Sequence, residues 1–166
     1  MNMQLLVNLT SKAWSLKILA QLHAGVSGRQ APLIAATGAS RSSFTASLEH
    51  LFQLGLLERN PGHGHPLRPE FRLTQNGIIA AETAFRIVQA VPDVGEFAVL
   101  RRSWTVPILA LTATPQRFSA IKTGLTTITD RALSTSLYQL EAKEWLQRDI
   151  DLSTRAPFPT YRTVNR

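Results

Sequence analysis

The 166-residue chain contains no cysteine. This absence excludes disulfide bonds, thiol redox chemistry and metal sites built on cysteine ligands. The chain also lacks any apolar run of the roughly 18 to 20 residues that a membrane-spanning helix needs. Its first residues, MNMQLLVNLTSK, have no basic region of the kind that opens a signal peptide. We therefore expect a cytoplasmic protein that is not associated with a membrane.

Motifs for catalysis and metal binding are missing as well. No serine stands in a nucleophile elbow, and no pair of carboxylates has a spacing that favours acid–base chemistry. The pair His63 and His65 has no third ligand nearby in sequence, which favours solvated or phosphate-facing histidines over a metal site. We expect neither an enzyme nor a protein with catalytic residues, a bound metal or a cofactor.

Positive charge is in excess. The chain has 18 Lys and Arg against 11 Asp and Glu, a formal net charge of +7, within a composition of 44% hydrophobic and 17% charged residues that is typical of globular proteins. An excess of this size favours a polyanionic partner, although it also aids solubility. Charge alone leaves both interpretations open.

The sequence repeats itself at a spacing of about 90 residues. AWSLKILAQ (13–21) and SWTVPILAL (103–111) each place a tryptophan ahead of the same apolar rhythm, and SRSSFTASLEHLFQLGLLER (40–59) aligns with TDRALSTSLYQLEAKEWLQR (129–148). This spacing is right for a small domain. We predict a first domain at 1–76, a connecting helix and linker at 77–100, and a second domain at 101–166.

The first helix of each copy is expected to carry its tryptophan into the core. In the first copy the helix spans 11–24, with Thr10 or Ser11 as its cap and Gly25 as its end. The apolar stripe is formed by Trp14, Ile18 and Leu22. In the second copy Ser103 or Thr105 is the cap, Pro107 lies in or near the first turn, and the stripe is formed by Trp104, Ile108 and Leu109.

A short helix, a turn and a longer helix follow in both copies. The short helices end at Gly38 and Gly124, and Ser40 and Thr129 cap the longer ones. The inward stripes of the longer helices are Phe44, Leu48 and Leu51 in the first copy and Leu133, Leu137 and Leu140 in the second. Extended segments in which Phe71 corresponds to Tyr161 then predict a two-stranded wing.

This order is that of a winged helix-turn-helix domain. The predicted fold class is mainly α with small β-wings (α+β), as two tandem winged helix-turn-helix domains joined by a helix. The joining helix has Ile78, Ala81, Phe85 and Val88 on one face and is expected to cover both cores.

Several segments carry a family resemblance. SWTVPILALT, QRFSAIKTGLTTIT, DRALSTSLYQLEAKEWLQR and PTYRTV, within residues 100–166, resemble the HxlR-type winged-helix regulators of bacteria. LEHLFQLGLLER and FRLTQNG in the first half are similar to the more general MarR-like winged helix. The resemblance implies a DNA-binding transcriptional regulator. HxlR-type chains usually hold one such domain and pair into a dimer, whereas two are fused here.

Candidate DNA contacts follow from helical phase. In helix-turn-helix binding the second helix enters the major groove and its outward residues meet base edges. Arg131 is the leading candidate, because an arginine can bind O6 and N7 of guanine together. The full set is Arg41, Ser42 and Thr45 in the first copy, Arg131, Ser134 and Thr135 in the second, and the wing residues Arg68, Arg72, Arg155 and Arg162. Tyr138 also points outward, and the hydroxyl residues are equally compatible with caps and solvated positions.

Two functions stay open from the sequence. The first is a sequence-specific regulator in which the fused domains act as a pseudo-dimer, with recognition helices about 34 Å apart on double-stranded DNA. The second is a tandem winged-helix module that binds other proteins, as in the family of segregation-and-condensation protein B, which the low arginine content of both recognition helices favours. The sequence leaves open a homodimer or a pseudo-dimeric monomer, and a small-molecule effector of unknown identity.

Overall fold

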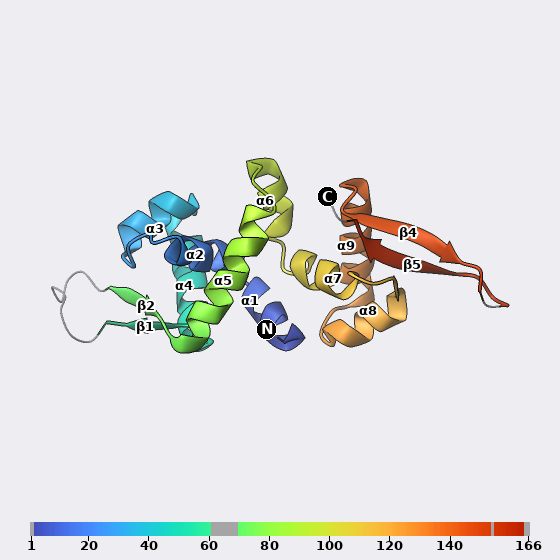
Figure 1. Cartoon of the computed structure of the whole chain (residues 1–166), viewed down its shortest axis with the longest axis horizontal. Helices are drawn as coiled ribbons and strands as arrows, with labels where there is room; N and C mark the ends of the chain where they lie inside the picture. The colour runs from blue at the N-terminus through green and yellow to red at the C-terminus, as the bar shows by residue number, and fades with distance from the viewer. Residues whose placement is uncertain (1, 61–69, 154, 165–166) are drawn as a thin grey trace. The chain divides into compact units, whose positions relative to one another are not determined.

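The computed structural model describes residues 2–60, 70–153 and 155–164. These residues are mainly helical, with two small antiparallel sheets (Figure 1). The chain divides into two compact units. Unit 1 comprises Asn8–Arg101, and unit 2 comprises Asn2–Val7 together with Arg102–Arg166.

Unit 1 is built around the contact between the helices Ser15–His23 and Gln75–Gln89. Side chains from three helices, including Ile18, Leu33 and Phe44, are fully buried in its core. The elements of the unit are α2 (Ser15–His23), α3 (Gln30–Thr37), α4 (Arg41–Gln53), β1 (Leu57–Arg59), β2 (Phe71–Leu73), α5 (Gln75–Gln89) and α6 (Val94–Leu100). The most extensive helix contact joins α2 to α5.

Unit 2 also has a helix, a short helix, a longer helix and an antiparallel hairpin in this order, with the additional strand β3 (Gln116–Arg117) before the second of these helices. Its core contains the fully buried Ile108, Ile121 and Leu133. The elements are α7 (Thr105–Leu111), β3 (Gln116–Arg117), α8 (Phe118–Leu125), α9 (Asp130–Ala142), β4 (Leu146–Asp151) and β5 (Phe158–Thr163). The strands lie in the order β3-β5-β4, and β4 and β5 form the long hairpin visible in Figure 1. The predicted fold class, mainly α with small β-sheets, is therefore confirmed for the described residues.

Two further helices were not expected. α1 (Met3–Thr10) precedes α2, and α6 stands in the same place before α7, each separated from the next helix by a short turn. α6 starts at the capping residue Asp93, whose side chain accepts a hydrogen bond from the Glu96 N–H at 3.0 Å. A helix thus precedes each of the two tryptophans. α6 belongs to unit 1, whereas Asn2–Val7 of α1 belong to unit 2.

The first helix of each copy does not begin at an expected cap. α2 starts at Ser15 and not at Ser11, which lies in the preceding turn and bonds to the carbonyl of Asn8 through both its N–H and its hydroxyl. Trp14 occupies the N-cap position, and no side chain caps the helix. The expected caps Thr10 and Ser11 are therefore wrong. In the second copy Ser103 and Thr105 are likewise not the cap, which is Trp104, while Pro107 lies in the first turn as expected.

The expectation that both tryptophans are core residues is also wrong. Trp14 and Trp104 are only partly buried, whereas Ile18 and Ile108 have no exposed surface. Each tryptophan sits at the N-cap, one residue before the first residue of its helix. Within unit 1 the ring centroid of Trp14 lies 5.8 Å from that of Phe97.

Replacement of either tryptophan is expected to have a moderate effect on stability. Trp14→Ala and Trp104→Ala should each lower the free energy of unfolding by about 2 kcal/mol, less than the 3 to 5 kcal/mol typical of a fully buried tryptophan. Urea unfolding of both variants measures this, with Ile18→Ala as the variant of a fully buried side chain. A loss above about 4 kcal/mol would mean that the tryptophan fills a closed core site.

The two glycines expected to stop the short helices behave differently. Gly38 is the C-cap of α3 with φ of +71°, as predicted. Gly124 lies inside α8, which ends at Leu125 and is followed by Thr126 with φ of +52°. A Cβ atom on Gly124 would lie 2.9 Å from the Leu111 side chain, so the glycine permits α8 to pack closely on α7. Its prediction as a helix stop is wrong.

The inward face of α5 also differs from the prediction. Ile78 was expected to point inward but is 49% exposed. The buried face consists of Gly77, Ala80, Ala81 and Ala84. A Cβ atom on Gly77 would lie 2.0 Å from the carbonyl oxygen of Leu56, which shows how closely this helix approaches its neighbours. Small residues form the contact face because larger side chains do not fit there.

Candidate nucleic-acid interface

The helix α9 presents a polar face opposite a buried one. The Thr129 side chain accepts a hydrogen bond from the Ala132 N–H at 3.2 Å, which confirms the predicted cap. The inward leucines, Leu133, Leu137 and Leu140, are buried as predicted. The opposite face exposes Arg131, Ser134, Thr135 and Tyr138, the last with 74% of its surface accessible. The helical phase predicted for this element is therefore confirmed.

The guanidinium of Arg131 is not neutralised within its own helix. Its neighbour Asp130 forms an ion pair with Lys122 of α8. Arg131 forms no ion pair with any residue that the structure describes, Glu141 included. A positive charge thus stands at the start of an exposed helix face, where it can meet an anionic or hydrogen-bonding partner.

The sheet of unit 2 carries two of the predicted wing arginines. Arg162 lies on β5 opposite Gln147 of β4, and its Nη2 donates to Gln147 Oε1 at 3.4 Å. Arg155 is exposed between the two strands. The predicted two-stranded wing is in fact part of a three-stranded sheet, because Arg117 of β3 pairs with Thr160 of β5. A strand of two residues is too short to give a sequence signal.

In unit 1 the corresponding helix is α4. The Ser40 side chain accepts from the Ser43 N–H at 3.3 Å, as predicted, and the inward residues Phe44, Leu48 and Leu51 are buried. Arg41, Ser42 and Thr45 are exposed on the other face. Thr45 Oγ1 donates to the carbonyl of Arg41 at 2.9 Å, so this hydroxyl already has a partner within the helix.

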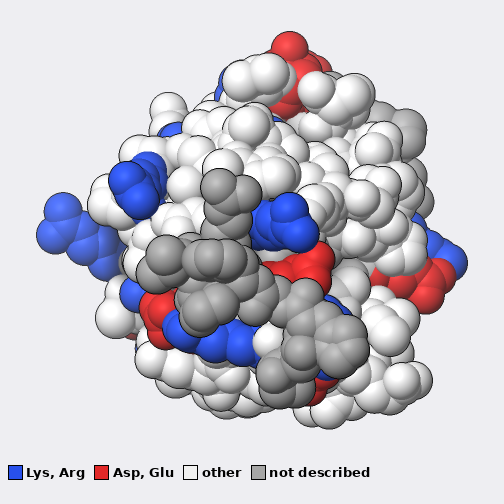
Figure 2. Space-filling view, turned by 90° about the vertical axis from the view of Figure 1, so that its left-hand side faces the viewer, with Lys and Arg blue, Asp and Glu red and all other residues white. Residues whose placement is uncertain are grey.

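The arginines of unit 1 near its sheet are paired with carboxylates. Arg72 lies 3.7 Å from Glu58, its partner across the β1–β2 ladder, and Arg59 lies 3.9 Å from Glu49 of α4. Figure 2 shows the molecule from the side on which β1 and β2 lie in Figure 1, and basic (blue) and acidic (red) residues lie side by side there. Arg68 lies outside the described residues, as do His63 and His65. The described charges on this face thus partly compensate one another, unlike Arg131.

Arg117 is a cation that sequence reasoning missed. Its guanidinium carbon lies 3.4 Å from the ring centroid of Phe158. Hydrogen bonds from the side chain and the backbone of Ser153 lower the pKa of Asp151, and the positive charge of Arg117 lowers it further. No spacing in the sequence connects Arg117 to these residues, because they come together only when β3 joins β5.

Two negative findings concern the described ranges 2–60, 70–153 and 155–164. These ranges contain no group of three or more His, Asp or Glu residues placed to hold a metal ion. No helix within them is both long and apolar enough to span a membrane.

Comparison with known proteins bears on unit 2. No curated protein matches the chain. The family model described as HxlR-like helix-turn-helix matches residues 99–161, a segment that contains α7, α8, α9 and β4. The match covers the same half in which the sequence motifs resemble that family, and it suggests DNA binding and transcriptional regulation. Residues 99–161 are thus similar to the HxlR-like helix-turn-helix regulators.

Proposed function

We propose that the protein is a sequence-specific DNA-binding transcriptional regulator. The observation that carries this proposal is the exposed face of α9, on which Arg131 stands beside Ser134 and Thr135 near the start of the helix. Arg131 forms no ion pair with a described residue. Arginine in this position reaches O6 and N7 of guanine when such a helix lies in the major groove. The similarity of residues 99–161 to HxlR-like helix-turn-helix proteins supports the same function.

The repeated order of elements supports a pseudo-dimer within one chain. α4 and α9 have the same length of 13 residues, and each is capped by a hydroxyl side chain. A regulator that reads two half-sites needs two such helices about 34 Å apart, which two separate copies usually supply. Here two tandem winged helix-turn-helix domains, the first MarR-like and the second HxlR-like, take the place of the two subunits on double-stranded DNA.

The two domains contribute differently to this complex. In unit 2, Arg131, Ser134 and Thr135 read bases, while Arg155 and Arg162 hold the backbone. In unit 1 the contacts come from Arg41, Ser42, Thr45, Arg68 and Arg72. Because Arg72 is paired with Glu58 at 3.7 Å, unit 1 adds less positive charge than its arginines alone imply. Most of the specific contact therefore comes from unit 2.

Selection of binding sites from a random duplex pool tests this assignment. Arg131→Ala should weaken binding to the selected site by about 1 to 3 kcal/mol and relax the preference at one base pair. Arg155→Ala should instead weaken all duplexes alike, because a backbone contact carries no sequence information. Lys143→Ala, at the far end of α9, is the matched control. An Arg131→Ala protein that selects the same motif with undiminished preference would show that α9 does not read DNA.

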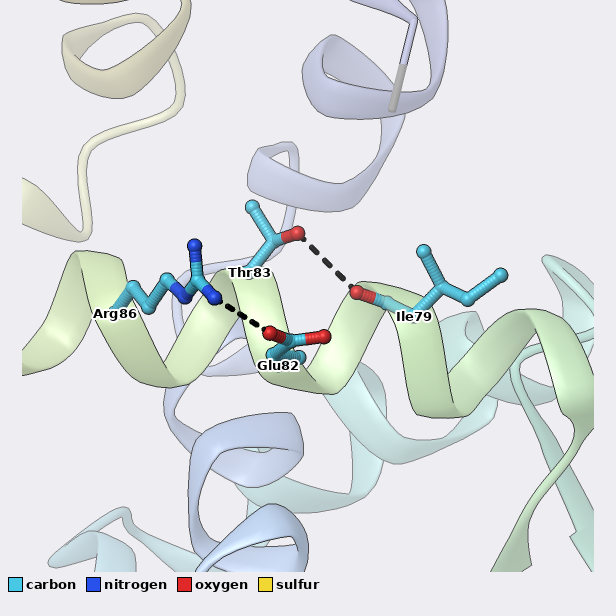
Figure 3. A network of polar contacts seen from close by, with 4 residues as sticks. All are labelled: Ile79, Glu82, Thr83 and Arg86. Carbon is cyan, nitrogen blue, oxygen red and sulfur yellow. Dashed lines mark hydrogen bonds and ion pairs between the residues drawn. The ribbon is translucent and has the colours of Figure 1, made fainter.

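A specific observation favours a second candidate function. α5 exposes Ile78 and Ile79, at 49% and 55%. Figure 3 shows Ile79 on the same helix as the ion pair between Glu82 and Arg86, whose closest N–O distance is 2.6 Å. Apolar side chains beside charged ones are common at protein–protein interfaces. This face fits a tandem winged-helix interaction module of the segregation-and-condensation type.

A further inference from the structure

Unit 2 has a shallow, open hollow of about 720 Å³ on its surface, lined by residues at the start of α8 and at the hairpin between β4 and β5. From the α8 side it is lined by Arg117, Phe118 and Ser119, and from the hairpin side by Arg155, Pro157 and Phe158. Most of its wall is therefore apolar, with two guanidinium groups and one hydroxyl among the lining groups. Neither arginine forms an ion pair within the described part of the chain.

Arg117 is held in place before any ligand binds. Its backbone is paired with Thr160 in the sheet, and its guanidinium lies on the Phe158 ring at 3.4 Å from the centroid. Stacking occupies one face of the guanidinium and leaves its edge N–H donors available. An arginine fixed in this way loses little conformational entropy when it binds an anion, which favours binding.

The lining groups define the chemistry of the ligand. Two guanidinium groups and a hydroxyl are donors that match the oxygens of a phosphate, which arginine binds through two parallel hydrogen bonds. The rings of Phe118 and Pro157 match the apolar face of a sugar. A phosphodiester with its adjoining deoxyribose has both parts.

We propose that this hollow binds one phosphodiester group of the DNA backbone, with Arg117 and Arg155 on the phosphate oxygens. The inference rests on the proposed function and adds Arg117 to the DNA-contacting residues. A free nucleotide offers the same phosphate and sugar, and the experiment below separates the two sources.

Asp151 opposes the binding of an anion here. Its carboxylate accepts a hydrogen bond from the Ser153 N–H at 2.8 Å and lies close enough to Arg117 to interact with its charge. Asp151→Asn keeps the oxygen that accepts this hydrogen bond but removes the negative charge. This variant should therefore bind DNA more tightly, opposite in sign to the loss of Arg117.

The first experiment measures the affinity of the full chain for a random-sequence duplex over a series of salt concentrations. Arg117→Gln should weaken binding about eightfold at about 0.1 M salt and reduce the slope of log affinity against log salt by about 0.9, the value for one phosphate contact. Phe158→Leu should produce part of this loss although every charge remains, because Arg117 is no longer held by the ring. Lys143→Gln is the control and should leave the affinity near that of the original chain, and thermal unfolding checks that each variant is folded. Unchanged affinity and slope in Arg117→Gln would overturn the inference.

The second experiment titrates the chain with thymidine 5′-monophosphate and follows backbone amide NMR signals. Shifts at Arg117, Ser119 and Arg155 that disappear in Arg117→Gln support phosphate binding in the hollow. If the chain binds this nucleotide but no duplex, the proposed DNA-binding function fails and the hollow stands as a site for a free nucleotide. If the chain binds neither, the inference is overturned.

Discussion

The affinity of the chain for random-sequence duplex DNA is expected to fall about a thousandfold between about 50 and 200 mM salt. Each arginine that neutralises a phosphate releases counterions from the duplex, which contributes about −0.9 to the slope of log affinity against log salt. The proposed phosphate contacts are six arginines, namely Arg41, Arg68, Arg72, Arg117, Arg155 and Arg162. Six such contacts give a slope of about −5.4.

The slope also reports which unit touches the DNA. Three arginine contacts from unit 2 alone would give a slope of about −2.7, half of the value for both units. Fluorescence anisotropy with a labelled duplex, at salt concentrations that span this range, measures the slope directly. Affinity that hardly changes with salt, or no binding at low salt, would support the protein-binding alternative.

Phe97→Ala is expected to lower the stability of unit 1 by about 3 to 5 kcal/mol, through the cavity that the lost ring leaves. Phe97 is 7% exposed, and its ring contacts Trp14 and lies 4.6 Å from the Lys17 Nζ. It belongs to α6, the helix that leads into the second copy of the repeat, yet its contacts are with the first copy. The reciprocal variant is Leu6→Ala, which should cost unit 2 about 2 to 5 kcal/mol because Leu6 is 7% exposed and Asn2–Val7 belong to that unit.

Native-state hydrogen exchange separates the two effects. Phe97→Ala should lower the protection of amides in α2 and α4, and Leu6→Ala should lower the protection of amides in α8 and α9. Val94→Ala is the control, because this side chain of α6 is 83% exposed. The opposite pattern, with Phe97→Ala loosening α9, would show that each leading helix stabilises its own copy.

The helices α4 and α9 could be predicted from the sequence because their signals are local. A hydroxyl cap and apolar residues at helical spacing fix where such a helix begins and which face is buried, and the structure confirms both for Ser40 and Thr129. The pairing of the strands could be inferred from the repeat. Phe71 lies opposite Arg59 and Tyr161 lies opposite Arg148, so the two ladders correspond as the alignment indicates.

The remaining features depend on contacts that no local pattern reveals. A glycine that ends a helix and a glycine that makes room for a neighbouring side chain look alike in sequence. The sequence therefore wrongly predicts that Gly124 ends its helix. Arg72 pairs with Glu58 because the register of β1 and β2 places the two residues opposite each other. Arg117 reaches the Phe158 ring because the two-residue strand β3 pairs with the edge of β5. Which arginines are free to bind an anion at the candidate interface therefore depends on the folded structure and not on local sequence.

The assignment of Asn2–Val7 to unit 2 has a consequence for the order in which the chain folds during synthesis. These residues leave the ribosome before Asn8–Arg101, but the rest of their unit follows only after the whole of Asn8–Arg101 has been made. Unit 1 has all its elements once α6 has emerged, so it is able to fold while synthesis continues. Unit 2 must then close a loop as long as the entire first unit, which carries an entropic cost and slows its formation. A nascent chain arrested just beyond Arg101 should thus contain a folded unit 1, while Asn2–Val7 are not yet packed against the rest of unit 2.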